Sequence, residues 1–242
     1  PAHPWPGRQR RAARPGAPSR AIRGFTAWIG TQDWSVASLA QWLNGSPKNG
    51  YSPVAVDENT GVFMLGLGCL TPFGFEPKQL KNAPRNDLKV DQALLQHGDL
   101  LVSRSNTRDL VGMASVYEDI GRPCIYPDLM MRLRPSDHTS SAFLEQVLRA
   151  PYVRKQIKAE AVGTSGSMVK INASKIQNLL VTIPGKDEQE RIMSRAKLAD
   201  SDIDSRMREL KKLCHLKDGL RDDLLTGRVR VPQAEAALER VM

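Results

Sequence analysis

The sequence predicts an α+β domain followed by one long helix of the coiled-coil type. Between residues 34 and 184, short apolar runs alternate with turns rich in Gly, Pro and Asn, which is typical of a domain built from short strands. From Asp187 onward, apolar residues recur every three or four positions, as on one face of a helix. We therefore expect a globular domain at residues 31–185 and a helix at residues 186–227.

Local signals predict the elements of the domain in order. Residues 36–43 form a short apolar segment, helical or extended, and residues 44–50 read as a turn by composition. Gly98 and Asp99 predict a tight turn into a buried strand, and Pro151 divides the helical periodicity of residues 140–159 into two pieces. The other expected elements are strands near 62–67, 111–116, 129–133 and 179–183, and a short helix that opens 171–178.

The long helix has its own start, seam and end. Asp187 and Glu190 have the spacing of a capping box just past Pro184, and Gly227 suits the position after the helix end. About 38 residues at about 1.5 Å each make a rod of roughly 57 Å. Such a rod is too long to bury its seam on one small domain, so we expect it to pair with another helix; the alternative is a lone helix folded back on its domain. The expected pairing residues are Ile192, Ile203, Met207, Leu210, Leu213, Leu220 and Leu224.

The net charge of +9 is concentrated at the N-terminus. Residues 1–30 contain six Arg and no acidic residue, and their Pro-rich composition predicts a disordered tail or linker. Residues 31–185 carry 16 basic and 14 acidic residues, and residues 186–242 carry 13 and 12. A nucleic-acid role therefore has to depend on the placement of individual cations and not on total charge.

The spacing of the cysteines and the hydropathy of the sequence indicate the expected cellular compartment. Cys69, Cys124 and Cys214 are far apart and lack C-x-x-C spacing, which argues against a disulfide framework or a zinc site. No apolar run approaches the roughly 18 residues of a membrane span. We expect a cytoplasmic protein without a membrane anchor, ending in a weakly helical tail at 228–242.

Five segments, in this order, resemble the specificity subunit of type I restriction–modification systems. They are residues 34–47, 98–107 with Gly112, 126–133, 163–168 and 183–192. The resemblance implies a target recognition domain at 31–185, which reads one half of a bipartite duplex DNA target, and a conserved spacer and dimerisation helix at 186–227. Family members often carry two recognition domains and two such helices, whereas this chain has room for one of each. We therefore expect a half subunit or the C-terminal half of a full one.

The resemblance also implies partners and cofactors. The partners would be double-stranded DNA, the modification (methyltransferase) subunits, a restriction (translocase/nuclease) subunit, and a second recognition domain held through helix pairing. S-adenosylmethionine, ATP and magnesium would belong to the partner subunits, so this chain itself needs no cofactor and is not an enzyme. Two alternatives stay open: an autonomous nuclease or methyltransferase with an unfamiliar motif, and a coiled-coil adaptor that does not bind DNA.

The loop after the predicted strand at 100–103 is the first candidate for reading DNA. Arg can pair with guanine and Asn with adenine through two hydrogen bonds each, and such a loop would be presented on a rigid base. The candidates are Arg104, Asn106, Thr107 and Arg108. The alternative is structural: Arg104 would pair with Asp99 or Asp109, and Asn106 would cap a turn.

A glycine-rich segment and a polar turn are further candidates. Between Gly163 and Lys170, small hydroxyl side chains and a flexible backbone would suit a phosphate, although a simple glycine turn is the alternative. The candidates there are Thr164, Ser165, Ser167 and Lys170, and the third loop contributes Ser46 and Lys48.

Catalytic signatures are weak. The sequence has no Asp/Asn-Pro-Pro-aromatic motif of an amino-methyltransferase and no Walker A motif. A nuclease reading of Asp128 would need a later acid-x-Lys string, and Glu209-Leu210-Lys211 lies in the predicted rod. Phe63, Phe73 and Phe75 are expected to pack in the core or in turns, although Gly74 leaves open that one ring is presented outward.

Overall fold

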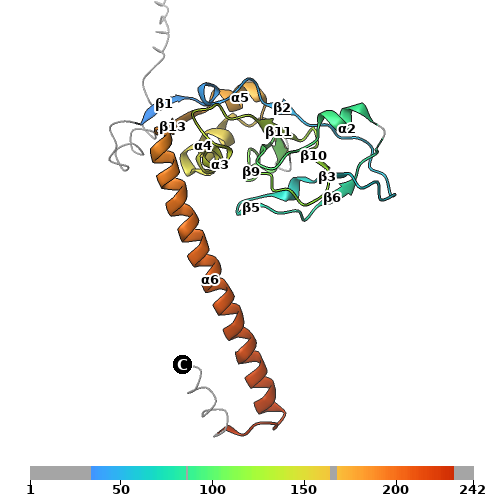
Figure 1. The fold of residues 1–242 in the computed structure, drawn as a ribbon, viewed down its shortest axis with the longest axis vertical. Helices are drawn as coiled ribbons and strands as arrows, with labels where there is room; N and C mark the ends of the chain where they lie inside the picture. The colour runs from blue at the N-terminus through green and yellow to red at the C-terminus, as the bar shows by residue number, and fades with distance from the viewer. Residues whose placement is uncertain (1–33, 86, 164–167, 232–242) are drawn as a thin grey trace, which may run out of the picture. The chain divides into compact units, whose positions relative to one another are not determined.

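A computed structural model describes residues 34–85, 87–163 and 168–231. The chain divides into two compact units, of which one ends at Gln189 and the other begins at Glu190 (Figure 1). The expectations for residues 1–30 and for most of the tail at 228–242 lie outside the described residues. The α+β class predicted from the sequence is confirmed, and so is the long helix that follows the domain.

A four-stranded antiparallel sheet forms the centre of the first unit, in the order β2 (Lys48–Asn49), β11 (Met130–Leu133), β7 (Leu100–Ser103) and β9 (Ala114–Val116). Met131 lies opposite Val102, and Leu101 lies opposite Ser115. All four residues of β7 are buried, as expected for the central run after the Gly98 turn. The predicted turn at 44–50 is partly wrong, because its last residues pair with β11 as strand β2.

A smaller sheet packs beside it, in the order β10 (Cys124–Ile125), β3 (Phe63–Leu65) and β6 (Leu80–Asn82). Strand β10 runs parallel to β3, and β6 runs antiparallel to β3. The turn η2 (Leu67–Cys69) and helix α2 (Leu88–Gln92) cover this sheet. One continuous core joins the two sheets, with Leu65, Leu101, Tyr117, Ile125 and Met130 nearly or fully buried.

Two helices cover the other side of the central sheet, α3 (Ser141–Arg149) and α4 (Pro151–Glu160). Ser140 caps α3 by accepting a hydrogen bond from the Phe143 amide (3.2 Å), and Pro151 occupies the first turn of α4. The predicted division of this helical segment at Pro151 is confirmed. The apolar faces of both helices supply Leu144, Leu148 and Val153 to the core.

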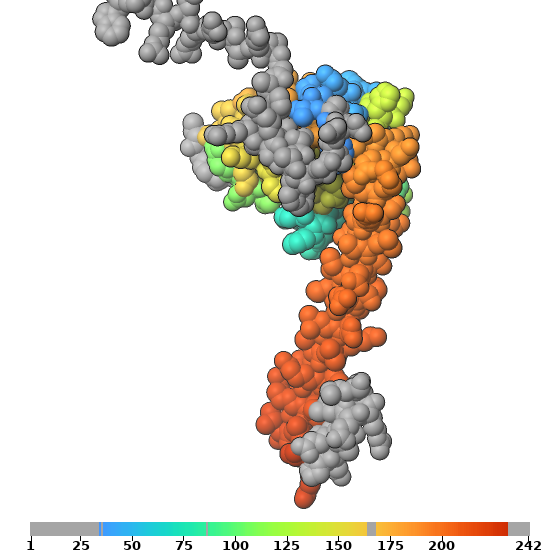
Figure 2. All heavy atoms as spheres, turned by 90° about the vertical axis from the view of Figure 1, so that its left-hand side faces the viewer, coloured from blue at the N-terminus to red at the C-terminus, as the bar shows by residue number. Residues whose placement is uncertain are grey.

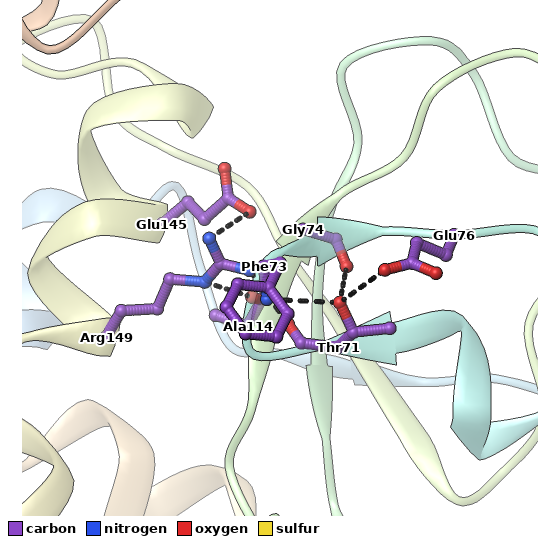
Figure 3. A network of polar contacts seen from close by, with 7 residues as sticks. All are labelled: Thr71, Phe73, Gly74, Glu76, Ala114, Glu145 and Arg149. Carbon is purple, nitrogen blue, oxygen red and sulfur yellow. Dashed lines mark hydrogen bonds and ion pairs between the residues drawn. The ribbon is translucent and has the colours of Figure 1, made fainter. Parts of the chain in front are cut away.

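The hairpin β4 (Leu70–Thr71) and β5 (Gly74–Phe75) is held by a polar network (Figure 3). Arg149 on α3 donates to the Thr71 carbonyl (2.9 Å) and to the Ala114 carbonyl (3.2 Å), and its guanidinium is paired with Glu145 (3.5 Å). The hairpin tip presents Phe73, whose side chain is 90% exposed. For Phe73 the structure therefore agrees with the alternative that one ring is presented outward, because the two-residue tip turns this ring away from the sheet.

Strands from the two ends of the first unit close it. Strand β1 (Ser35–Ser38) pairs antiparallel with β13 (Leu180–Ile183), and the short helix η1 (Leu39–Trp42) follows β1. The segment at 36–43 is thus extended first and helical afterwards. Helix α5 (Ala173–Gln177), capped by the Asn172 side chain, precedes β13, as the sequence predicted.

Helix α6 spans Lys186–Leu225. It begins one residue before Asp187, so Asp187 lies inside the first turn and the predicted capping box is wrong; its carboxylate still lies near the positive helix end. Gln189 is the one buried residue of α6, and the expected pairing residues beyond it are exposed or half-exposed (orange to red in Figure 2). Gly227 has φ +71° and ends the helix by donating to the Leu224 carbonyl (3.2 Å). Among the described residues, no helix is long and apolar enough to cross a membrane.

Candidate nucleic-acid interface

Two candidate segments that are about 60 residues apart in sequence lie side by side. Strand β8 (Ser105–Asn106) pairs antiparallel with β12 (Val169–Lys170), with Ser105 opposite Lys170 and Asn106 opposite Val169. The Ile171 amide also donates to the Arg104 carbonyl (2.9 Å). The loop after β7 and the glycine-rich segment therefore form one surface.

The described ends of the glycine-rich segment meet in a short antiparallel bridge. Val162 and Lys170 exchange two backbone hydrogen bonds, of 2.9 and 2.8 Å. A Cβ at Gly163 would lie 2.8 Å from the Met168 carbonyl oxygen, so the two arms of the loop approach too closely for another residue. Gly163, Met168 and Lys170 are exposed. The candidates Thr164, Ser165 and Ser167 lie outside the described residues.

Arg104 is half-exposed beside this bridge. Its Nη1 donates a long hydrogen bond to the Asp128 carbonyl (3.4 Å). The structural alternative for Arg104 is wrong, because Asp99 pairs with Arg132 (3.0 Å) and Asp109 pairs with Lys158 (2.6 Å). The hydrogen bond from Lys158 also holds the pKa of Asp109 below its usual range. Arg104 thus keeps most of its donors available to a ligand.

The protein engages the other three candidates of this loop to different degrees. The Asn106 side chain accepts from the Thr107 amide (2.8 Å) and donates to the Ser103 hydroxyl (3.5 Å), which agrees with the alternative that Asn106 caps a turn. Arg108 donates to the Lys158 carbonyl on α4 (3.1 Å), while the side chain of Thr107 is exposed. Asn106 is therefore held by the turn, whereas Arg104, Thr107 and Arg108 keep side-chain donors available.

The third candidate loop precedes and includes the start of β2 in the chain, and it contacts α5. The Ser46 hydroxyl donates to the Gln177 side-chain oxygen on α5 (3.4 Å), and Lys48 is exposed on β2 at the edge of the central sheet. Pro47, between them, is buried. The structure therefore joins this loop to the element that follows the glycine-rich segment.

Comparisons with known proteins agree with the sequence resemblance. No protein-family model and no curated protein matches this sequence. Among solved structures, a chain from a study of complex assembly and conformational transition in a type I restriction–modification system matches 85% of this chain at 19% identity, with a TM-score of 0.53. The HsdS subunit from Thermoanaerobacter tengcongensis (81% of this chain, 18% identity, TM-score 0.49) and the type I S subunit from M. genitalium (79%, 18%, 0.48) also match.

This chain shares its fold with the chain from the type I restriction–modification system. The match covers 45% of the first of these solved chains, 42% of the second and 44% of the third, so this chain spans less than half the length of each. The family resemblance inferred from five short segments is confirmed at the level of the fold.

The globular unit also contains a basic hollow that the sequence did not predict. It has a volume of about 510 Å³ and lies between β2, α2 and β11. Of its four cationic lining residues only Lys48 was a candidate; Lys89, Arg132 and Arg134 were not. The signal that could have found it is the alternation of Arg132 and Arg134 in and just after a strand, but the lysine of α2 comes from a segment more than 40 residues away.

Proposed function

We propose that this chain is a DNA sequence-recognition subunit of a type I restriction–modification system. Its globular unit would read one half of a bipartite duplex target. The observation that carries the proposal is the pairing of β8 with β12, which brings the loop at 104–108 and residues 168–170 onto one exposed surface. The fold shared with a type I restriction–modification chain supports the same role.

Each candidate side chain would contribute a different contact. Arg104, which has no acidic partner among the described residues, would pair with a guanine edge through two hydrogen bonds. Lys170, Lys48 and Arg108 would neutralise backbone phosphates, which position the protein without reading sequence. The hydroxyls of Ser46, Thr107, Thr164, Ser165 and Ser167 would add neutral phosphate contacts.

Helix α6 would hold this domain at a fixed distance from a second recognition domain. The exposed apolar side chains of Ile203, Met207, Leu210 and Leu213 follow one another at steps of three and four, as a pairing seam requires. The second helix would come from another copy or from the other half of the same subunit. The modification and restriction subunits would supply catalysis together with S-adenosylmethionine, ATP and magnesium, so the chain itself would be non-catalytic.

Sequence enrichment from a random duplex pool tests the proposal directly. The full chain, with and without modification subunits, should enrich one set of half-sites. Arg104→Ala should relax one position of that set at a cost of about 1–3 kcal/mol. Arg195→Ala, which removes an exposed arginine from α6, is the matched control and should leave the enriched set unchanged. Absence of enrichment under both conditions would refute DNA reading and favour the adaptor alternative, and cleavage or methylation by the chain alone would favour an enzyme.

A further inference from the structure

The basic hollow between β2, α2 and β11 has no carboxylate in its lining. Its wall carries four cationic side chains, Lys48, Lys89, Arg132 and Arg134, and two tyrosine rings. Arg132 is neutralised by Asp99 at 3.0 Å, and both of these side chains are largely buried. Among the described residues, the other three cations form no ion pair. The hollow therefore carries a net positive charge that no acidic side chain in its lining offsets.

The two tyrosines are built into the wall. The Arg132 guanidinium lies over the ring of Tyr126 (5.4 Å), and the Lys89 ammonium lies over the ring of Tyr51 (5.5 Å). The Tyr51 hydroxyl donates to Asp87 (2.7 Å), which also caps α2. The Asp87 carboxylate is thus engaged by two hydrogen-bond donors, the Tyr51 hydroxyl and the Lys89 amide, and it also attracts the Lys89 ammonium.

The shape of the hollow depends on a close approach of β2 to Tyr126. A Cβ at Gly50 would lie 2.1 Å from the Tyr126 carbonyl oxygen and 2.6 Å from its ring. The Tyr51 amide donates to the same carbonyl (2.9 Å). Glycine at this position lets the chain pass directly over Tyr126, so the two aromatic rings line the same space.

The hollow is linked to the surface around Arg104. Ser52, the residue after Tyr51, donates through its hydroxyl to the Asp128 carboxylate (2.5 Å). The Asp128 carbonyl in turn accepts the hydrogen bond from Arg104 (3.4 Å). The fold therefore places Arg104 and the cationic hollow on neighbouring backbone, with one residue, Asp128, touching both segments.

We propose that this hollow binds a backbone phosphate of duplex DNA, with Lys89 and Arg134 as its principal charges and Lys48 at its rim. This inference rests on the proposed function and deepens it. A phosphodiester is the ligand that fits, because the site offers ammonium, guanidinium and amide donors and no carboxylate that would repel an anion. Asn49 and Gln92 supply the amide donors. Contact there would set the register of Arg104 on the bases.

The test measures how binding of a random-sequence duplex depends on salt. Loss of one phosphate contact lowers the slope of log K against log [salt] by about 0.9, which is about eightfold in affinity at roughly 0.1 M salt. Lys89→Gln and Arg134→Gln in the full chain should each show this change, and the double variant should bind about 60-fold more weakly. Arg134→Lys keeps the charge and should keep the slope. Both side chains are exposed, so folding should be retained, as circular dichroism would verify.

The control is Lys212→Gln, which removes an exposed cation from α6 in the other compact unit and should leave the slope unchanged. Equal slopes for wild type, Lys89→Gln and Arg134→Gln would overturn the phosphate site, and so would failure of the wild type to retain the random duplex at 50 mM salt. Failure of the proposed function gives a different result. In that case the wild type enriches no half-site, but the salt slopes of Lys89→Gln and Arg134→Gln still differ from that of the wild type.

Discussion

Gln189 offers the sharpest test of how the globular unit is held together. Its side chain is 3% exposed and makes three hydrogen bonds. The amide nitrogen donates to the His138 carbonyl and to the Pro184 carbonyl, both at 2.9 Å, and the amide oxygen accepts from the Thr139 hydroxyl at 2.9 Å. One side chain therefore ties the first turn of α6 to the segment before α3.

The cost of Gln189→Ala follows from these three bonds. Each contributes about 1 kcal/mol net, and each partner that is left buried without a bond adds to the loss. The sum is about 3 to 5 kcal/mol, a large share of the roughly 5–15 kcal/mol by which a domain is stable. Thr139→Val removes one bond and should cost about 1 kcal/mol.

Urea unfolding followed by near-ultraviolet circular dichroism measures both changes. Glu190→Ala is the matched control, because Glu190 is the exposed neighbour of Gln189 in α6 and should change stability by less than about 0.5 kcal/mol. A loss of less than about 1 kcal/mol in unfolding free energy for Gln189→Ala would contradict these three contributions, provided that the dependence of that free energy on urea concentration equals that of the wild type.

Three further outcomes are expected. Burial raises the pKa of Glu145 above its usual value, against the opposing effect of Arg149. The stability of the wild type relative to Glu145→Gln should therefore be highest below about pH 4 and should fall as pH rises. A difference in urea midpoint that stays constant with pH would contradict this. Gly112→Ala should cost about 3 kcal/mol, because φ is +66° and the new Cβ would lie 2.5 Å from Ile157; Gly98→Ala, with φ +90° and open space, should cost only the backbone strain, and equal losses in urea unfolding would refute the clash. Leu210→Asp, at a side chain 54% exposed, should abolish helix pairing, and an unchanged mass in light scattering would count against the seam.

Elements whose determinants are adjacent in the chain were predictable. Pro151 divided a helical pattern because proline suits a first helical turn and breaks a helix interior, and the structure has two helices there. The buried run of β7 and the long helix α6 were predictable for the same reason, since their periodicities are local. Helix α6 begins at Lys186, so Asp187 lies inside its first turn and does not cap it.

The candidate surface was only half predictable. The sequence indicated Arg104 and Lys170 as candidates in two separate loops. No local pattern indicates that β8 and β12 are neighbours, because strands of two residues have no measurable period. The sequence left the exposure of Phe73 open for a related reason, because the residue that anchors its hairpin, Arg149, lies more than 70 residues away.

The sequence by itself determined which segments of this protein form helices and buried strands, where they are interrupted, and which family the order of its segments resembles. These properties depend on residues a few positions apart. Only the folded structure shows which loops share a surface, which arginines form ion pairs with acidic residues, and that Lys89 and Arg134 line one hollow. Such outcomes depend on long-range strand pairing and packing, where the free energy of many weak contacts is shared among segments that the chain brings together only when it folds.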